Sequence, residues 1–163
     1  MATTVGEYIK RDHDDFRLIF ERLRNSAENE AALRGEVYPF LIDRVQAHAV
    51  AEEATIFPQM EKDSNLLPAT LVLIAEHRGM DTLARELAET PFDARTWRPK
   101  LFPLFDVMRC HLAREEADVF PRVSCRFSPE ALEEAGEEFQ RILQREWKIK
   151  GLHGGLPPAM QRR

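Results

Sequence analysis

The chain has 163 residues and a formal net charge of -5, and its composition is 44% hydrophobic and 31% charged. This length suits one domain with a normal core, and this composition favours a folded soluble protein over a disordered chain. An acidic protein repels phosphate backbones, and no stretch approaches the about 20 consecutive apolar residues that span a bilayer, so we expect neither nucleic acid nor a membrane as partner.

The N-terminus and the cysteines bear on location. The first 16 residues have no apolar core behind a basic start, so they do not resemble a secretory signal peptide. The two cysteines, Cys110 and Cys125, are too few for a disulfide framework and favour reduced thiols. We therefore expect a cytoplasmic protein.

The first half of the chain predicts two helices. Thr4 can open a capping box for the first helix, which should end near residues 25–26 and which carries His13 on its apolar stripe. The second helix should run from about Ala31 through an HxxxE motif. Pro39 lies inside that span and should mark a late start or a kink.

The second half predicts three more helices. Asn65 can cap a third helix that ends at residues 90–91, and a fourth should run from about residue 97 to 121. The third helix should turn these residues toward the core: Leu71, Ile74, His77, Leu83 and Leu87. Ser128 and Pro129 suit the start of a fifth helix that ends near Lys150. The tail beyond it is rich in glycine and proline and should be poorly ordered.

An internal repeat organises these elements. Residues 46–60 and 109–123 align without a gap and share a histidine, two glutamates, an alanine and a Phe-Pro pair. A further histidine precedes each block at nearly the same distance. The fold expected is all-α, an antiparallel up-down four-helix bundle built from two repeated helix pairs over residues 1–123. Residues 124–163 should add a helix and a flexible tail, packed on or extending from the same domain.

The repeated residues have the chemistry of a metal site. Histidine and glutamate at positions i and i+4 share a helix face, about 5–6 Å apart at Cβ, so both can reach one ion. In an antiparallel bundle the two copies can meet in the core. The candidate metal ligands are His13, His48, Glu52, His77, His111 and Glu115. Imidazole and carboxylate suit iron, manganese or zinc, and the absence of a cysteine ligand argues against a closed structural zinc site.

This pattern resembles the hemerythrin-like, or HHE cation-binding, domains, whose signature is H…HxxxE…H…HxxxE/D with a Phe-Pro pair after each motif. The match covers about residues 5–123 and includes the acidic residue before the third-helix histidine, in Glu76-His77. The resemblance implies two non-haem iron ions joined by an oxo or hydroxo bridge, with manganese or zinc as substitutes. The two histidines of each helix pair would hold one ion, and the two glutamates would bridge the ions.

One position departs from the oxygen carriers of that family. They have an additional histidine about one turn before the residue that matches His77, and here that residue is Leu73. Each iron would then have about five ligands and would keep an open or water-filled position. Two open positions favour reaction with peroxide, nitric oxide or oxygen over reversible oxygen carriage.

Several residues near the motifs keep alternative interpretations. Asp81 lies four residues after His77 and is either a substitute ligand or an ion-pair partner of Arg17. Glu53 and Glu116 follow the candidate ligands, and a solvated or supporting role suits them better than ligation. Cys110 should be a small buried residue. The fifth helix either covers the bundle end or forms a dimer surface, and a homodimer is one expectation.

Three functions compete at this stage. The first is a di-iron protein that binds or consumes oxygen, hydrogen peroxide or nitric oxide, which as an enzyme would be an oxidoreductase. The second is a non-catalytic iron or oxygen sensor, or an iron-homeostasis protein, that acts through a partner. The third is a metal-free interaction bundle, which the duplicated ligand sets disfavour.

Overall fold

The computed structural model describes residues 3–152 and 155–161, and within those ranges it contains helices and turns but no strand. The helices are α1 (Val5–Arg24), α2 (Ala31–Ala54), α3 (Ile56–Met60), α4 (Leu67–Ala88), α5 (Trp97–Arg114), the π-helical turn η1 (Glu115–Val119), α6 (Phe120–Ser124), α7 (Pro129–Ile149) and α8 (Pro158–Gln161). The expectation of an all-α fold is confirmed.

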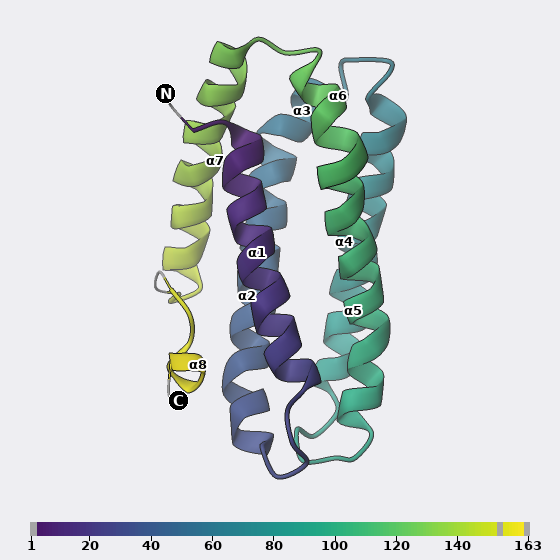
Figure 1. The fold of residues 1–163 in the computed structure, drawn as a ribbon, viewed down its shortest axis with the longest axis vertical. Coiled ribbons are helices and arrows are strands. Elements are labelled where there is room, and N and C mark those ends of the chain that lie inside the picture. The colour runs from purple at the N-terminus through teal and green to yellow at the C-terminus, as the bar shows by residue number, and fades with distance from the viewer. Residues whose placement is uncertain (1–2, 153–154, 162–163) are drawn as a thin grey trace.

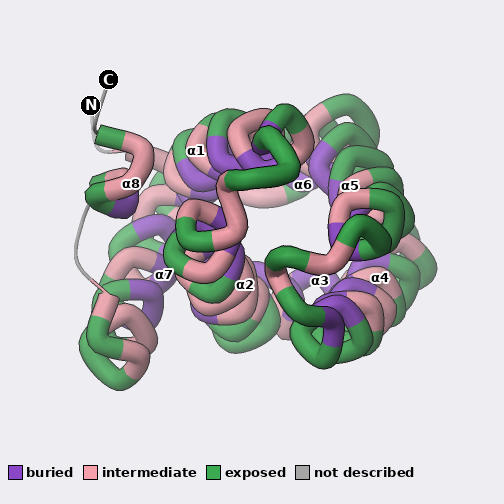
Figure 2. Tube along the Cα trace, turned by 90° about the horizontal axis from the view of Figure 1, so that it is seen from below, coloured by how far each residue is buried: buried purple, intermediate pink, exposed green. Residues whose placement is uncertain are grey.

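Four long helices, α1, α2, α4 and α5, form the bundle, and successive helices run in opposite directions (Figure 1). α1 packs on α2, and α4 packs on α5. α7 lies along α1 and α2 on the outside of the bundle. The end-on view in Figure 2 shows buried segments on the helix faces that turn inward and exposed segments on the outer faces. In the described ranges, no helix is long and apolar enough to cross a membrane.

Local signals set two of the helix starts as expected. The Glu7 carboxylate accepts a hydrogen bond from the backbone N–H of Thr4 at 2.8 Å, as in a capping box. The Ser128 hydroxyl accepts from the backbone N–H of Ala131 at 3.2 Å, and Pro129 occupies the first turn of α7.

The start of α4 differs from the expectation. Leu66 is the N-cap residue, while Asn65 donates its backbone N–H to the Asp63 carboxylate at 2.8 Å. Leu71 is 55% exposed, and Leu73 is the buried residue of this turn. The physical reason is angular: at about 100° per residue, six residues place Leu71 about 120° away from His77, whereas Leu73 shares its face.

Pro39 does not delay the start of α2. The helix begins at Ala31, as expected, and continues through Pro39, so of the two alternatives for this proline the late start is wrong. Its middle is held by burial of Tyr38, whose hydroxyl donates to the Ala84 carbonyl at 2.7 Å. The fourth helical segment continues through η1 and α6 to Ser124, past the expected end at residue 121.

The core consists of two apolar clusters. One contains Ile9, Leu73 and Phe139, and the other contains Phe16 and Trp97. The buried histidines of the sequence motifs lie between residues of the first cluster and residues of the second along each bundle helix. A polar layer is therefore enclosed between two hydrophobic halves.

One smaller expectation is wrong. Cys110 is exposed rather than buried, because it lies on the outer face of α5. The expectation of a poorly ordered tail stays a prediction. Over residues 155–161 the tail includes α8, Met160 packs against the core, and the Ala159 N–H donates to Glu36 at 2.7 Å. The part of that expectation that falls on residues 153–154 and 162–163 lies outside the described residues.

Candidate metal centre

The structure brings all six candidate ligands into one layer. Each is buried, with at most 6% of its surface exposed. They come from every long helix of the bundle and from the π turn: His13 on α1, His48 and Glu52 on α2, His77 on α4, His111 on α5 and Glu115 on η1. The i, i+4 spacing and the antiparallel packing thus produce the predicted cluster.

Each glutamate lies between one histidine of each helix pair. The Glu52 carboxylate lies 3.4 Å from Nε2 of His48 and 3.3 Å from Nε2 of His77. The Glu115 carboxylate is placed in the same way, 3.2 Å from Nε2 of His13 and 3.4 Å from Nε2 of His111. Ligand atoms within 4.8 Å of one another form two overlapping groups: His13, His48 and Glu52; and Glu52, His77, His111 and Glu115.

The outer nitrogen of every histidine contacts a further carboxylate. The four Nδ1–O distances are 2.8–2.9 Å, in the pairs His13–Glu116, His48–Asp12, His77–Glu53 and His111–Glu76. The pairs follow the repeat. The acid before the first histidine binds the second histidine of the same unit, and the acid after each motif glutamate binds the first histidine of the other unit.

These outer contacts determine which nitrogen carries the proton. An ionised carboxylate only accepts hydrogen bonds, so each Nδ1 must donate, and in a neutral imidazole Nε2 then carries a lone pair. Among the residues that the structure describes, Nε2 of His13 and His48 and all four carboxylate oxygens of Glu52 and Glu115 find no hydrogen-bond partner. Buried acceptors that face one another are costly unless a cation lies between them. The residues present therefore fit bound metal ions, and the outer carboxylates are the supports that metal-binding histidines require.

The charges of the cluster also favour bound cations. Burial raises the pKa of the Glu115 carboxyl well above its usual value, and the negative charge of Glu52 raises it further. Burial opposes a charged imidazole at His48, but the carboxylates of Glu52 and Asp12 outweigh it and raise the pKa of His48 to about 10. With protein groups alone, protons must balance the carboxylates. Metal ions would replace those protons, so metal affinity should fall as the pH falls.

Aromatic side chains enclose the layer. The Phe16 ring lies edge-on to His48 at 5.2 Å between centroids, and Phe57 stacks on His77 at 5.6 Å. Phe139 of α7 also meets His48 edge-on, at 5.4 Å. α7 thus closes one side of the metal layer. Its buried face packs along the side of the bundle, against α1 and α2, and does not cover the bundle end.

The two repeats differ in backbone after the motif glutamate. In the first repeat, α2 ends at Ala54, and the Thr55 hydroxyl bonds the Ala51 carbonyl at 2.6 Å. In the second repeat, Glu115 opens a π turn that continues directly into α6. π turns inside helices are frequent at functional sites. Residue types do not predict this difference, because both repeats carry the same Phe-Pro pair.

The repeats also differ in how their outer acids are held. Asp12 accepts from the guanidinium of Arg44 at 3.3 Å, and this arginine side chain is 2% exposed and packs on the Trp147 ring at 4.6 Å. Glu76, its counterpart, accepts from Nε of Arg114 at 3.0 Å, and that arginine side chain is 43% exposed. One acid is therefore held by a buried cation and the other by a surface cation.

The structure decides most of the alternatives near the motifs. Asp81 is exposed and accepts from the Gln46 amide at 3.1 Å, so it is neither in the ligand cluster nor paired with Arg17. Arg17 instead pairs with Asp14 and Glu116. The supporting role expected for the acids after the motif glutamates is the one observed.

Asp12 is the contributing residue that sequence reasoning missed. The available signal was the repeated acid-histidine dipeptide, Asp12-His13 and Glu76-His77.

A pocket of about 360 Å³ reaches the layer between α2 and α4. His77 and Glu53 line it together with the polar side chains of Gln46, Asp81 and Lys150. A small polar molecule could approach the layer by this path.

Comparison with known proteins gives the same assignment. The family model described as "Hemerythrin HHE cation binding domain" matches residues 4–123. A crystal structure of a hemerythrin HHE cation-binding domain-containing protein from Mycobacterium kansasii shares the fold, with a TM-score of 0.74 and 20% sequence identity over 90% of this chain and 89% of that chain. A curated DNA nickase from Nostoc sp. strain PCC 7120 is 24% identical over 141 residues, which are 83% of this chain and 38% of the nickase, so the chain spans well under half of that relative. The chain belongs to the hemerythrin HHE cation-binding domain family.

Proposed function

We propose that the protein holds two non-haem iron ions in the buried layer and binds or reacts with a small oxidant: oxygen, hydrogen peroxide or nitric oxide. One observation carries the proposal. Four imidazoles with outward-bound protons turn their Nε2 atoms toward two carboxylates whose oxygens have no hydrogen-bond partner. That arrangement is electrostatically complete only with cations in it.

The donor set favours a pair of iron ions. Imidazole and carboxylate donors without thiolate suit iron and allow manganese or zinc as substitutes. His77 and His111 with both glutamates offer one ion four protein donors, and His13 and His48 with Glu52 offer the other ion three. Further positions on each ion would remain for water or a ligand. Bound iron would supply reversible electron transfer and a place for the oxidant to bind.

The protein groups hold and protect this site. Asp12 and Glu116 keep the protons of two imidazoles on their outer nitrogens, which fixes the ring orientations. Phe16 and Phe57 cover the rings and exclude water. Leu73 is fully buried four residues before His77 and offers no donor. This residue supports our preference for reaction over reversible oxygen carriage.

Small molecules are the partners we propose. The net charge of -5 disfavours a nucleic-acid partner. The match to the DNA nickase supports no such partner here, since it covers only 38% of that protein.

The test combines metal analysis with rapid kinetics. Protein produced with added iron should contain close to two irons per chain and should show a visible absorption band. Its ferrous form is then mixed with oxygen, peroxide or nitric oxide in a stopped-flow instrument. The double variant Glu52→Ala/Glu115→Ala is the control that should lose metal and spectrum. Two irons with fast peroxide consumption support the proposal, iron without turnover supports a sensor, and no metal excludes both.

A further inference from the structure

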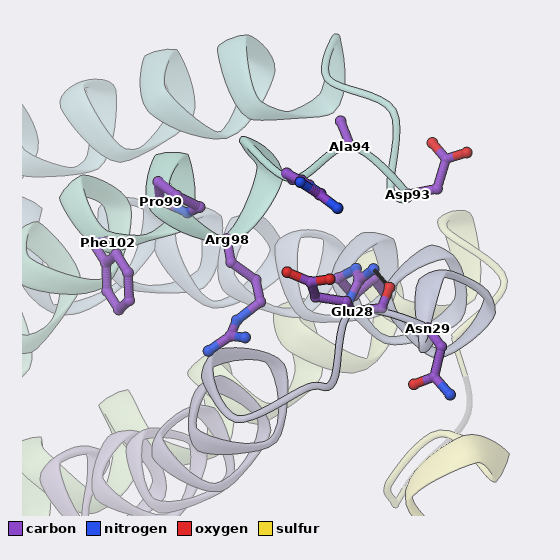
Figure 3. Close-up of a pocket in the computed structure, with 9 residues that line it drawn as sticks. Glu28, Asn29, Asp93, Ala94, Arg98, Pro99 and Phe102 are labelled. Atoms are coloured by element: carbon purple, nitrogen blue, oxygen red, sulfur yellow. Dashed lines mark hydrogen bonds between the residues drawn. The ribbon is translucent and has the colours of Figure 1, made fainter.

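A second pocket, of about 520 Å³, is lined by residues of the α1–α2 and α4–α5 loops and of α2 and α5 (Figure 3). Both loops lie at the same end of the bundle (Figure 1). Three arginines and two acids line it together with an apolar wall: Arg34, Arg95, Arg98, Glu28, Asp93 and Phe102. None of the six candidate ligands or of their carboxylate partners is among its lining residues. The pocket is therefore separate from the metal layer.

Arg34 places a buried positive charge in the lining of this pocket. Its side chain belongs to a residue that is 2% exposed, and its guanidinium donates to the carbonyls of Phe92 at 2.7 Å, Ala27 at 2.6 Å and Glu28 at 2.9 Å, and to the Ser26 hydroxyl at 3.2 Å. Within residues 3–152 and 155–161 no carboxylate lies within ion-pair distance of it. Carbonyl dipoles hold the guanidinium in place, and its charge interacts at longer range with the Glu30 carboxylate, which is itself paired with Arg22.

Two more arginines add to this charge. In the described part of the chain, neither Arg95 nor Arg98 forms an ion pair, and Nε of Arg98 is buried without a hydrogen-bond partner. Figure 3 shows the Arg98 side chain extending away from α5. The Asp93 side chain points away from the Arg98 side chain. Glu28 offsets part of the charge, and the lining keeps a positive balance of one.

An apolar surface lies beside the arginines. Phe102 lines the same pocket, and 42% of this residue is exposed.

We propose that this pocket binds a small molecule that carries a compact anionic group, a phosphate or a carboxylate. Arg95 and Arg98 would bind the anionic group, since guanidinium matches the geometry of both oxyanions. Arg34 supplies fixed charge, and Phe102 contacts the remainder of the molecule. The pocket is a binding site only, with no chemical step.

The experiment uses the full chain, loaded with metal, at constant ionic strength set by sodium chloride. Inorganic phosphate and succinate are titrated separately by isothermal calorimetry, so the two arms distinguish a phosphate ligand from a carboxylate ligand. The test variant is Arg95→Gln/Arg98→Gln. The control is Arg141→Gln/Arg145→Gln on the exposed face of α7, where the side chains are 64% and 56% exposed and the change in net charge is the same.

The natural protein should bind one of the two anions saturably, with one site per chain. The test variant should weaken that binding about ten-fold or more, since two charge-assisted hydrogen-bond donors are lost, while the control should change it less than two-fold. Equal weakening in both variants would assign the binding to net charge and overturn the proposal. Absence of saturable binding of either anion to the natural protein would overturn it as well. Metal content and peroxide kinetics are measured in separate experiments. A negative result for anion binding therefore leaves the metal proposal standing.

Discussion

Arg44 should be far more important for stability than Arg114, although both hold an acid that orients a metal-layer histidine. The perturbation is Arg44→Met beside Arg114→Met, because methionine keeps much of the side-chain volume and removes the charge. Arg44 is 2% exposed and pairs with Asp12, whose side chain is 10% exposed. Arg114 is 43% exposed and pairs with Glu76, whose side chain is 18% exposed.

The magnitudes follow from burial. Removing one partner of a buried ion pair costs about 3–5 kcal/mol, because the remaining charge stays buried. Asp12 keeps His48 as a partner at 2.9 Å, so the lower end applies, about 3 kcal/mol. An exposed pair contributes about 0–1 kcal/mol, which sets the expectation for Arg114→Met. In a protein of this size, 3 kcal/mol corresponds to a decrease of about 6–12 °C in Tm.

Urea unfolding of the metal-free proteins, followed by circular dichroism, measures both changes. The variant Asp12→Asn/Arg44→Met provides an internal check: its cost should be at least about 1 kcal/mol less than the sum of the single changes, because the two residues interact directly. Equal destabilisation by Arg44→Met and Arg114→Met would refute the reasoning. Strict additivity in the double variant would refute it too.

Four further predictions test other parts of the account. Removing metal with a chelator should lower Tm clearly, because six buried donors lose the cations that they share; equal calorimetric transitions would contradict this. Glu115→Ala should abolish the paired site, whereas His13→Ala should leave an ion at the other histidine pair, as metal-to-protein ratios will show. Leu73→His should add a donor, prolong an oxygen adduct and slow peroxide consumption in stopped-flow traces; normal metal binding with neither change would mean that this position does not face the site. Gly136→Ala should destabilise by about 1–3 kcal/mol in urea unfolding, because its Cβ would lie 2.8 Å from a carbonyl oxygen of the N-terminal segment, whereas Gly79→Ala, with no atom within 4 Å, should stabilise by about 0.5–1 kcal/mol.

The metal layer could be predicted because it depends on local spacing and on repetition. His48 and Glu52 share a helix face by spacing alone, and the second copy of the motif implies a second helix that presents the same groups. Antiparallel packing of two such copies then leaves few arrangements other than a shared layer. The fold class followed from the same periodicity.

Helix phase and backbone detail could not be predicted in the same way. Leu71 and Leu73 are both leucines near the start of α4, and only the observed helix start and packing decide which one is buried. The π turn at Glu115 has no counterpart after Glu52, where α2 ends at Ala54 although the two segments match in sequence.

The partners around the layer come from long-range packing. The pairing of Asp12 with Arg44 joins residues 32 positions apart, and the cation then packs on Trp147 of α7. Nothing in the local pattern of any of the three segments indicates this contact. Sequence reasoning therefore identified the groups that face the metal layer and missed one that holds them in place.

The most direct test of the central claim is anomalous diffraction at the iron edge from crystals of the iron-loaded protein. The account predicts two anomalous peaks per chain in the buried layer, one beside His13 and His48 and one beside His77 and His111, with Glu52 and Glu115 between them. A single peak, no peak after iron reconstitution, or peaks away from these side chains would contradict it.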